Sequence, residues 1–311
     1  MLYLHMIDAT NNNNNNNNMY LENYTKSLVK NINKKKLPSK MNLVFDGGAF
    51  NGLFGYGVLL YLKELERQKL TTIKKISGTS IGSVLGLVYI LDLAVDLEKW
   101  FCEITGQFKQ TGLLTKFHTN LRELIIDISK DQIKSLEGRL YITYYNVKKK
   151  RRTVVKKYRN KEHLYQCICR SSYLPVITDG GLTYQDKYID GITPYIFNTH
   201  PTLFVKLLTR KKMLRCMSVK NEKNIQYRVL TGLADANEFF MEGSSNMCCY
   251  VHERSLVDLF LLQMREYFCL IIYFVIRIAI HYNTILPNTV SQLGLSKCKG
   301  VFLLFMRDLI G

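Results

Sequence analysis

The pentapeptide Gly78-Thr79-Ser80-Ile81-Gly82 places one serine between two glycines, in the pattern G-x-S-x-G. This pattern is informative where it joins a strand to a helix, because the glycines relieve crowding in a sharp turn and the serine hydroxyl then projects into a cleft. The N-terminus of the following helix favours negative charge that develops near it. Ser80 is therefore a candidate nucleophile, and the alternative interpretation is an accidental turn of small residues.

A second segment suited to chemistry is the glycine loop Asp46-Gly47-Gly48-Ala49-Phe50-Asn51-Gly52. Its unhindered amides can point at an oxyanion near the N-terminus of the next helix. Dinucleotide binding is a weaker interpretation, because Ala49 takes the place of the middle glycine in G-x-G-x-x-G. Residues 68–70, about where a ribose-binding carboxylate belongs, are Gln, Lys and Leu.

A serine nucleophile needs a base within hydrogen-bond reach. The histidines stand in no recognisable turn and are interpreted as surface or packing residues; they are His5, His118, His163, His200, His252 and His281. A carboxylate at a strand end is the other kind of base, and Asp190-Gly191 follows the strand-like Lys187-Tyr188-Ile189. The alternative is an α/β-hydrolase that uses a histidine, such as His200 or His252, as its base.

The elements around these motifs determine how they are positioned. The short apolar run Met41–Phe45 predicts a buried strand and Ile73–Ser77 predicts a second short strand, and each ends in one of the glycine turns. Apolar residues at helical spacing in Leu53–Gln68, and an apolar run in Ser83–Leu93, predict a helix after each turn. Two strand–turn–helix units in succession predict an α/β fold, in which a parallel sheet carries helices on its faces.

The remaining elements before residue 200 are predicted in outline. Residues 92–132 read mostly helical, and Glu162–Ser172 reads as a further helix. β-branched and aromatic residues in Arg139–Val147 and Thr153–Tyr158 predict a hairpin. The connection of this hairpin, Lys148-Lys149-Lys150-Arg151-Arg152, carries five positive charges.

Taken in chain order, these motifs resemble those of the patatin-like phospholipases, a family of lipid acyl hydrolases with a Ser/Asp dyad. The resemblance covers roughly residues 41–197. Residues 46–52 resemble the oxyanion loop D-G-G-G-x-[RK]-G, residues 78–82 the nucleophile elbow, and Asp190-Gly191 the catalytic D-G-[GA] motif. Ser171-Ser172-Tyr173-Leu174-Pro175 resembles the stretch of small residues and proline that precedes this aspartate.

The resemblance implies a three-layer α/β/α sandwich with a central, mostly parallel sheet, and a catalytic core over residues 41–200. It implies that Ser80 attacks the ester of a phospholipid or related lipid and that Asp190 acts as its base. The oxyanion would be held by the amides of Gly47, Gly48 and Ala49. The acyl-enzyme is released by water, and neither a metal nor a cofactor is expected.

Three positions depart from the family pattern. Ala49 replaces the third glycine of the loop, which is tolerable if its φ is negative, and Asn51 replaces the basic residue. Ile192 follows Asp190-Gly191 where Gly or Ala is expected, and a β-branched residue there crowds the cleft or resists a positive φ. The alternative function is therefore a catalytically impaired member that acts as a basic module binding membranes or nucleic acid.

A second aspartate competes for the role of the base. Asp179-Gly180-Gly181 matches D-G-G more literally than Asp190 and its neighbours do. We prefer Asp190, because it follows strand-like residues and lies fifteen residues past Pro175. Asp179 lies four residues past that proline and reads as a turn.

Composition and charge limit the partners of this 311-residue chain. The sequence has 43 Lys plus Arg against 25 Asp plus Glu, a net charge of +18, which favours an anionic partner such as an acidic phospholipid surface. No RNA-binding or helix-turn-helix signature is present, so nucleic acid is not expected. Eight cysteines without a CxxC pair and without a leader predict an intracellular protein, cytoplasmic or peripherally bound to membranes.

The two ends of the chain are predicted to lie outside the catalytic core. Residues 1–40, with the asparagine run Asn11–Asn18, are expected to be disordered. Residues 201–311 are basic and apolar, with a long helix over Ser255–His281 and no assigned role. Within this predicted helix, the longest uncharged stretch is Tyr267–Ile276, which has ten residues, whereas a membrane span needs about 20. A transmembrane segment around residues 267–280 is therefore not expected, and the sequence does not indicate an oligomeric state.

Overall fold

The computed structural model describes residues 14–32, 37–199, 201–208 and 225–285. The described strands are β1 (Met41–Phe45), β2 (Ile73–Gly78), β3 (Leu140–Asn146), β4 (Arg151–Val155), β5 (Tyr188–Asp190), β6 (Thr202–Val205) and β7 (Cys248–Tyr250). They form one seven-stranded sheet in the order β4-β3-β2-β1-β6-β7, with β5 paired to β3. The neighbours β3, β2, β1 and β6 run parallel, whereas β4, β5 and β7 pair antiparallel.

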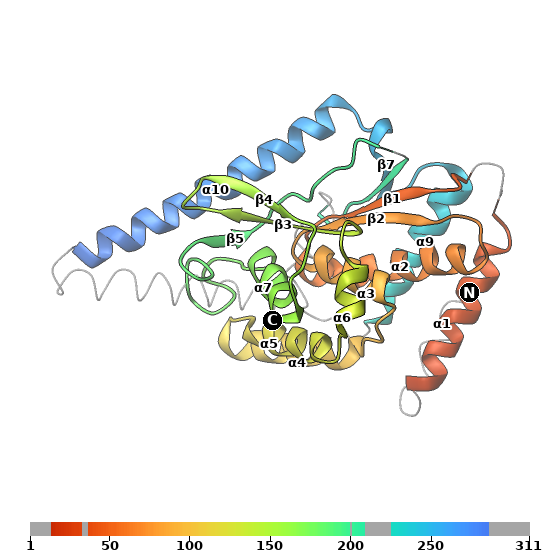
Figure 1. The fold of residues 1–311 in the computed structure, drawn as a ribbon, viewed down its shortest axis with the longest axis horizontal. Helices are drawn as coiled ribbons and strands as arrows, with labels where there is room; N and C mark the ends of the chain where they lie inside the picture. The colour runs from red at the N-terminus through yellow and green to blue at the C-terminus, as the bar shows by residue number, and fades with distance from the viewer. Residues whose placement is uncertain (1–13, 33–36, 200, 209–224, 286–311) are drawn as a thin grey trace.

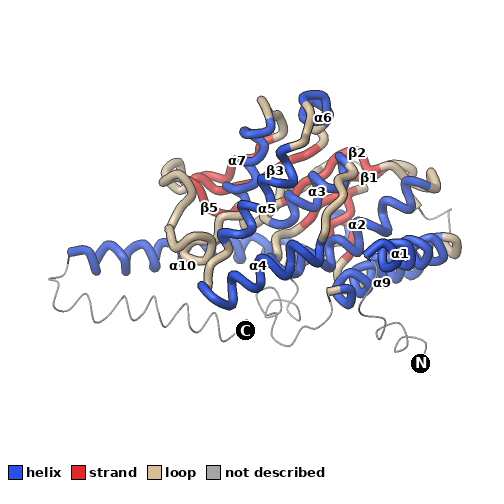
Figure 2. Tube along the Cα trace, turned by 90° about the horizontal axis from the view of Figure 1, so that it is seen from below, coloured by secondary structure: helices blue, strands red, loops and turns tan. Residues whose placement is uncertain are grey.

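Helices lie on both faces of this sheet. They are α1 (Asn14–Val29), α2 (Gly52–Arg67), α3 (Ile81–Leu91), α4 (Leu97–Thr111), α5 (Thr115–Ile126), α6 (Lys130–Ser135), α7 (Lys161–Ser171), α9 (Gln226–Glu242) and α10 (Leu256–Ile285). In Figure 1, α2, α3, α6 and α7 lie below the strands and α10 crosses above them; Figure 2 looks onto the helix-rich face from below. The predicted α/β class with a mostly parallel central sheet is confirmed.

The side chains of β1 alternate between two cores. Met41, Leu43 and Phe45 belong to the main core, which they share with α2 and α3. Val44 points to the opposite face, where it packs with Phe204 of β6 and other aromatic side chains. Because both of its faces are covered, β1 reads as a nearly continuous apolar run, which is why it is recognisable in the sequence.

The sheet and its helices continue past the boundary expected at residue 200. Four described elements after residue 200 were not predicted: β6, α9, β7 and the short 3₁₀ helix Val251–Glu253. Strand β6 pairs with β1 in the middle of the sheet. Helix α9 crosses α2 so closely that a Cβ on Gly57 would lie 2.0 Å from the Val229 carbonyl oxygen. A Cβ on Gly232 would lie 1.9 Å from the Phe54 carbonyl oxygen. The core of the molecule therefore includes residues from both sides of position 200.

The N-terminal segment also differs from its expectation of disorder. Helix α1 begins within the asparagine run, at Asn14, and the main core includes Val29 and Ile32, which are 0% and 6% exposed. Residues 1–13 and 33–36 of this segment lie outside the described residues. The first residues of α1 are polar and have little tendency to form a helix alone. Packing of apolar side chains near the end of α1 into the core therefore stabilises this helix.

Strands β2 and β5, which are far apart in the sequence, pair with the same edge of β3. The first residues of β3, Leu140–Ile142, pair with β2, and its last residues, Tyr144–Asn146, pair with β5. The other edge of β3 is occupied by β4, so β5 continues along the edge that β2 leaves. Gly78 at the end of β2 pairs with Ile142, and Asp190 pairs with Tyr144, two residues further on. The C-terminal ends of β2 and β5 therefore lie close together along β3.

Candidate active site

Ser80 occupies a strained turn between β2 and α3. Its backbone has φ 53° and ψ −131°, a conformation that side-chain-bearing residues rarely adopt. A Cβ on Gly78 would lie 2.2 Å from the Gly82 carbonyl oxygen, and one on Gly82 would lie 2.6 Å from the Asp46 carbonyl oxygen. Both flanking positions therefore require glycine, and the strand can turn directly into the helix with Ser80 at the corner.

The backbone of Ser80 is held by the last residue of α7. The Ser80 amide donates to both the carbonyl oxygen and Oγ of Ser171, each at 3.0 Å. Ser171 Oγ donates in turn to the carbonyl oxygen of Thr143 in β3, at 2.6 Å. Thr79 Oγ1 donates to the same carbonyl oxygen at 3.3 Å. The strained turn is thus fixed by polar groups from two neighbouring elements.

Asp190 ends β5 beside this turn. Its amide donates to the Tyr173 carbonyl oxygen at 2.9 Å, and its Oδ1 accepts from the Ile192 amide at 2.7 Å. Burial raises the pKa of Asp190 to about 6, although hydrogen bonding by Ile192 and by the Ser80 side chain lowers it. The positive charge of Arg265 also lowers this pKa, and Asp46 raises it. The structure thus brings Ser80 and Asp190 together, each with 8% of its surface exposed.

The predicted oxyanion loop follows β1 and packs on the serine turn. A Cβ on Gly47 would lie 3.4 Å from Ser80 Cβ, so this loop borders the candidate nucleophile. The Gly47 amide, however, donates to Asp46 Oδ1 at 3.0 Å. Ala49 has φ 43°, so the condition of a negative φ is not met. The Gly47 amide is therefore already bonded. The amides of Gly48 and Ala49 are the two predicted donors that we retain as candidates for binding an oxyanion.

Arg265 of α10 is the site residue that the sequence analysis missed. Its Nη1 and Nη2 donate to the two carboxylate oxygens of Asp46, at 2.9 and 2.7 Å. Nη2 also donates to the Ile192 carbonyl oxygen at 2.9 Å. The guanidinium therefore joins the loop after β1 to the turn after Asp190. No local signal marks this role, because Arg265 lies 219 residues after Asp46.

Asn51 and Gly52 connect the glycine loop to its surroundings. The family pattern has a basic residue at position 51, and here the fully buried Asn51 donates from Nδ2 to the Leu207 carbonyl oxygen at 2.8 Å. Its Oδ1 accepts from Arg228 of α9 at 3.3 Å. A Cβ on Gly52 would lie 2.3 Å from Cγ1 of Ile81, so glycine is needed where the loop meets the serine turn.

Ile192 adopts the positive φ that the sequence analysis identified as a difficulty. Its φ is 61°, which is unusual for a β-branched residue. The turn is nonetheless formed, with the Ile192 amide bonded to Asp190 and its carbonyl oxygen bonded to Arg265. Gly191 is required beside it, because a Cβ there would lie 2.2 Å from the Thr143 carbonyl oxygen.

The competing bases have contacts elsewhere. Asp179 Oδ1 accepts from the Tyr173 hydroxyl and from the Gly181 amide, as expected for a turn. His118 packs against aromatic rings, and His163 accepts from the Arg159 amide. His252 stacks on Tyr250. His200 and the side chain of His281 lie outside the described residues.

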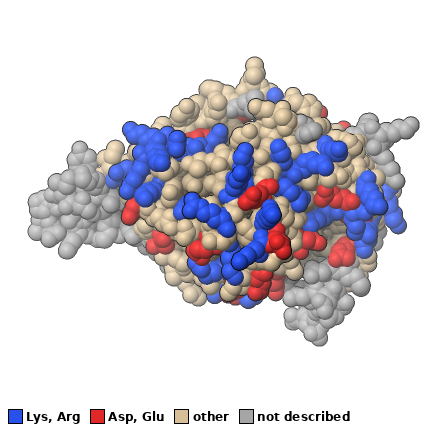
Figure 3. Space-filling model, in the orientation of Figure 1, with Lys and Arg blue, Asp and Glu red and all other residues tan. Residues whose placement is uncertain are grey.

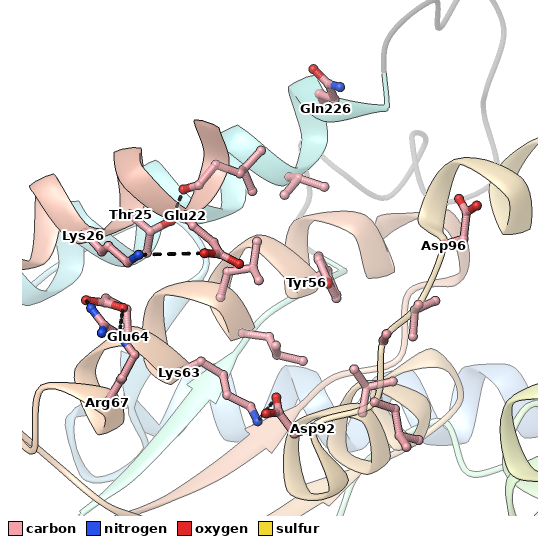
Figure 4. Close-up of a pocket in the computed structure, with 18 of the residues that line it drawn as sticks. Glu22, Thr25, Lys26, Tyr56, Lys63, Glu64, Arg67, Asp92, Asp96 and Gln226 are labelled. Atoms are coloured by element: carbon pink, nitrogen blue, oxygen red, sulfur yellow. Dashed lines mark hydrogen bonds and ion pairs between the residues drawn. The ribbon is translucent and has the colours of Figure 1, made fainter. Parts of the chain in front are cut away.

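One cleft of about 890 Å³ lies away from these residues. Its walls come from α1, α2, the start of α9 and the segment before α4 (Figure 4). Polar side chains such as Lys63, Glu64 and Asp92 face it, and none of its lining residues belongs to the turn of Ser80, the glycine loop or the turn of Asp190. This cleft is therefore separate from the candidate active site.

Comparison with known proteins identifies relatives of this arrangement. The sequence profile of the patatin-like phospholipase family matches residues 43–203. An omega-hydroxyceramide transacylase of Mus musculus is 26% identical over 162 residues, covering 48% of this chain and 26% of that protein. The chain thus spans about a quarter of the length of that relative. The crystal structure of VipD from Legionella pneumophila is 14% identical with a TM-score of 0.28, over 51% of this chain and 47% of VipD.

Proposed function

Because the chain belongs to the patatin-like phospholipase family, we propose that it is a lipid acyl hydrolase with a Ser80–Asp190 dyad. The observation that supports this proposal is that Gly78, two residues before Ser80, and Asp190 pair with nearby positions of β3, so that the Ser80 side chain lies close enough to lower the pKa of Asp190. The fixed, strained backbone of Ser80 supports the same role, since strain of this kind is typical of positioned nucleophiles.

The proposed reaction has two halves. Asp190 takes the proton of Ser80 Oγ while that oxygen attacks the ester carbonyl carbon, and the amides of Gly48 and Ala49 donate to the resulting oxyanion. The C–O bond to the alcohol breaks, and the alcohol leaves with the proton from Asp190. A water molecule then attacks the acyl-enzyme with Asp190 again as base, which releases the fatty acid and restores the Ser80 hydroxyl.

The proposed base predicts a pH dependence. Asp190 acts only when it is ionised, and its pKa is raised to about 6, chiefly by burial. Acylation should therefore be slow below pH 5, rise through about pH 6 and reach a plateau above pH 7. The raised pKa also makes the carboxylate a stronger base than an ordinary exposed aspartate.

The acyl group could also pass to an alcohol instead of water. The mouse relative carries the name of a transacylase, which favours this second candidate function. The chemistry at Ser80 is the same in both cases, and only the acceptor in the second half differs. An assay with and without an added long-chain alcohol separates them, since transfer gives a new ester and hydrolysis gives free fatty acid.

The proposed partner is an anionic phospholipid surface. The side chains of Lys148 to Arg152 are exposed at the turn between β3 and β4, where two of them, Arg151 and Arg152, already belong to β4. Figure 3 shows Lys and Arg side chains gathered over this part of the molecule. Each basic side chain near an anionic bilayer contributes about 1 kcal/mol of attraction.

The decisive measurement is fatty acid release from mixed phospholipid vesicles, together with labelling by a fluorophosphonate. Ser80→Ala should lower the rate by at least about 10³-fold and abolish labelling. Asp190→Ala should lower it comparably, whereas Asp179→Ala, the matched aspartate control, should retain most activity if it folds. Loss with Asp179→Ala and survival with Asp190→Ala would reverse the assignment. A folded wild-type protein that is not labelled, yet still binds vesicles, would favour the impaired module instead.

A further inference from the structure

Helix α10 has one side that is anchored to the candidate active site. Besides the contacts of Arg265, the Thr193 hydroxyl donates to Glu266 Oε2 at 2.6 Å. Tyr273, two turns further on, is 3% exposed and packs with Ile189 of β5 and with Tyr145 of β3. The anchored positions 265, 266 and 273 share one helical face, which therefore faces the protein.

The opposite side of α10 is apolar and exposed. Phe260, Met264, Tyr267, Phe268, Ile271 and Val275 have between 45% and 63% of their surface exposed. Their spacing of three and four residues places them in a continuous stripe. Proteins that stay in water rarely expose an apolar stripe of this length, so the face marks a binding site for another apolar surface.

By length and composition, residues Leu256–Ile278 of α10 are also a candidate membrane span. Their mean hydropathy is 1.8, and 6% of the 18-residue stretch that meets this criterion is buried. A spanning orientation conflicts with the anchored side. It would remove Arg265 from the Asp46 carboxylate and place both Arg265 and Glu266 in hydrocarbon, at about 2.5 to 3.5 kcal/mol per charge near the centre. A helix that lies flat keeps both contacts and still covers its apolar stripe.

We propose that the exposed stripe of α10 is the surface on which this protein lies flat on an anionic lipid bilayer. Charge complementarity identifies the bilayer as the occupant, because the exposed cations between β3 and β4 lie beside α10. Arg152 of that hairpin approaches Glu266 of α10 to 3.5 Å and donates to Thr193 at 2.8 Å. An apolar stripe next to a basic group is the arrangement that interfacial helices use, with the stripe about 5–10 Å into the headgroup boundary.

When α10 lies on the bilayer, the candidate active site lies next to the membrane surface. Arg265 on the anchored side contacts Asp46 and Ile192 directly, so the Ser80 turn lies close behind the bound helix. The significance for catalysis rests on the proposed function, because only a lipid substrate would need this proximity. Binding through the stripe does not depend on it.

The first experiment is flotation of the full chain with vesicles of phosphatidylcholine and phosphatidylserine. Phe268→Ser with Ile271→Ser should reduce the bound fraction at least tenfold. Ile126→Ser with Met241→Ser, which replaces two apolar side chains that are 57% and 43% exposed elsewhere, should leave it within twofold of wild type. Thermal melting checks that both variants fold. Equal recovery of the two folded variants would overturn the proposal.

A failure of the proposed function is distinguishable from a failure of this inference. Ser80→Ala should float like the wild type, and the Phe268→Ser, Ile271→Ser variant should keep its fluorophosphonate labelling in solution. If labelling is absent and flotation still depends on the stripe, only the catalytic proposal fails. If the stripe variant changes a dimer into a monomer and flotation is unaffected, the stripe binds a second copy and this inference is wrong.

The second experiment measures the depth of the helix. Phe268→Trp is introduced with Trp100→Phe, which removes the single native tryptophan. Vesicles should shift the emission to shorter wavelength, and lipids brominated near the headgroup end of the chain should quench it more than lipids brominated at the chain end. An unshifted spectrum would contradict bilayer contact. Strongest quenching from the chain end would show a deeply inserted helix and would also overturn the flat orientation.

Discussion

The turns that carry Ser80 and Asp190 both contain a strained backbone conformation, but different contacts stabilise it in each turn. Each holds a non-glycine residue at positive φ, Ser80 at 53° and Ile192 at 61°, at a cost of about 1–3 kcal/mol. At the Ser80 turn, the flanking glycines and the backbone contacts of Ser171 provide the support. At the Asp190 turn, support comes from the side chains of Arg265 and Glu266 on α10.

The comparison shows that glycines and neighbouring core elements fix one half of the candidate site, whereas side chains of α10 fix the other half. The Ser80 turn is enclosed by the core, where a Cβ on either glycine would overlap backbone atoms. The Asp190 turn depends on α10, whose outer face is largely exposed. Substitutions at the first turn should therefore cost more stability than substitutions at the second turn, and loss of the Arg265 contact should also change the chemistry.

The largest effect is expected from Gly78→Ala. The new Cβ would lie 2.2 Å from the Gly82 carbonyl oxygen, so the chain must shift where Ser80 is positioned. We expect a loss of more than about 3 kcal/mol in the free energy of unfolding, measured by urea denaturation, together with loss of fluorophosphonate labelling. Gly106→Ala is the control, since nothing lies within 4 Å of its Cβ, and it should stabilise helix α4 by up to about 1 kcal/mol.

Arg265→Met should have the next largest effect. It leaves the Asp46 carboxylate, which is 3% exposed, without its ionic partner, and should lower the free energy of unfolding by about 2 to 3 kcal/mol. The charge of Arg265 also lowers the pKa of Asp190, so its removal should move the acid limb of the labelling rate to higher pH. Arg277→Met, an exposed position on the same helix, is the control. An unmoved pH profile would mean that Arg265 only supports the fold.

The smallest effect is expected from Ile192→Gly. Glycine accepts a φ of 61° without strain, but it loses more backbone entropy on folding. The net gain should be about 1 kcal/mol, measured as a higher denaturation midpoint at an unchanged slope. Ile192→Ala keeps a Cβ and should gain less. If glycine destabilises the protein, then the side-chain packing of Ile192 outweighs the strain, and the two turns differ less than we infer.

The elements around the serine were predictable because their signals are local. The predicted strand Met41–Phe45 coincides with β1, and the predicted helix Leu53–Gln68 differs from α2 by one residue at each end. Continuous apolar runs that end in glycines are typical of buried parallel strands. Ser80, Asp190 and the glycine loop were likewise proposed as site residues from short motifs and their order along the chain.

The later part of the sheet was not predictable in the same way. Strand β6 has four residues, Thr202–Val205, and owes its conformation to pairing with β1 rather than to any pattern of its own. Helix α9 mixes polar and apolar residues and follows a basic run that reads as irregular. The role of Arg265 depends on a contact across 219 residues, which no local pattern records.

The shared edge of β3 has a consequence for how this site can vary. Ser80 follows β2, Asp190 ends β5, and both strands pair with β3. The separation of the two residues is therefore set by hydrogen-bond register rather than by the length of chain between them. Residues added to the connection between Tyr173 and Tyr188 cost only loop entropy, which grows slowly with length. A slip of β5 by a single position would instead turn the aspartate to the other side of the sheet.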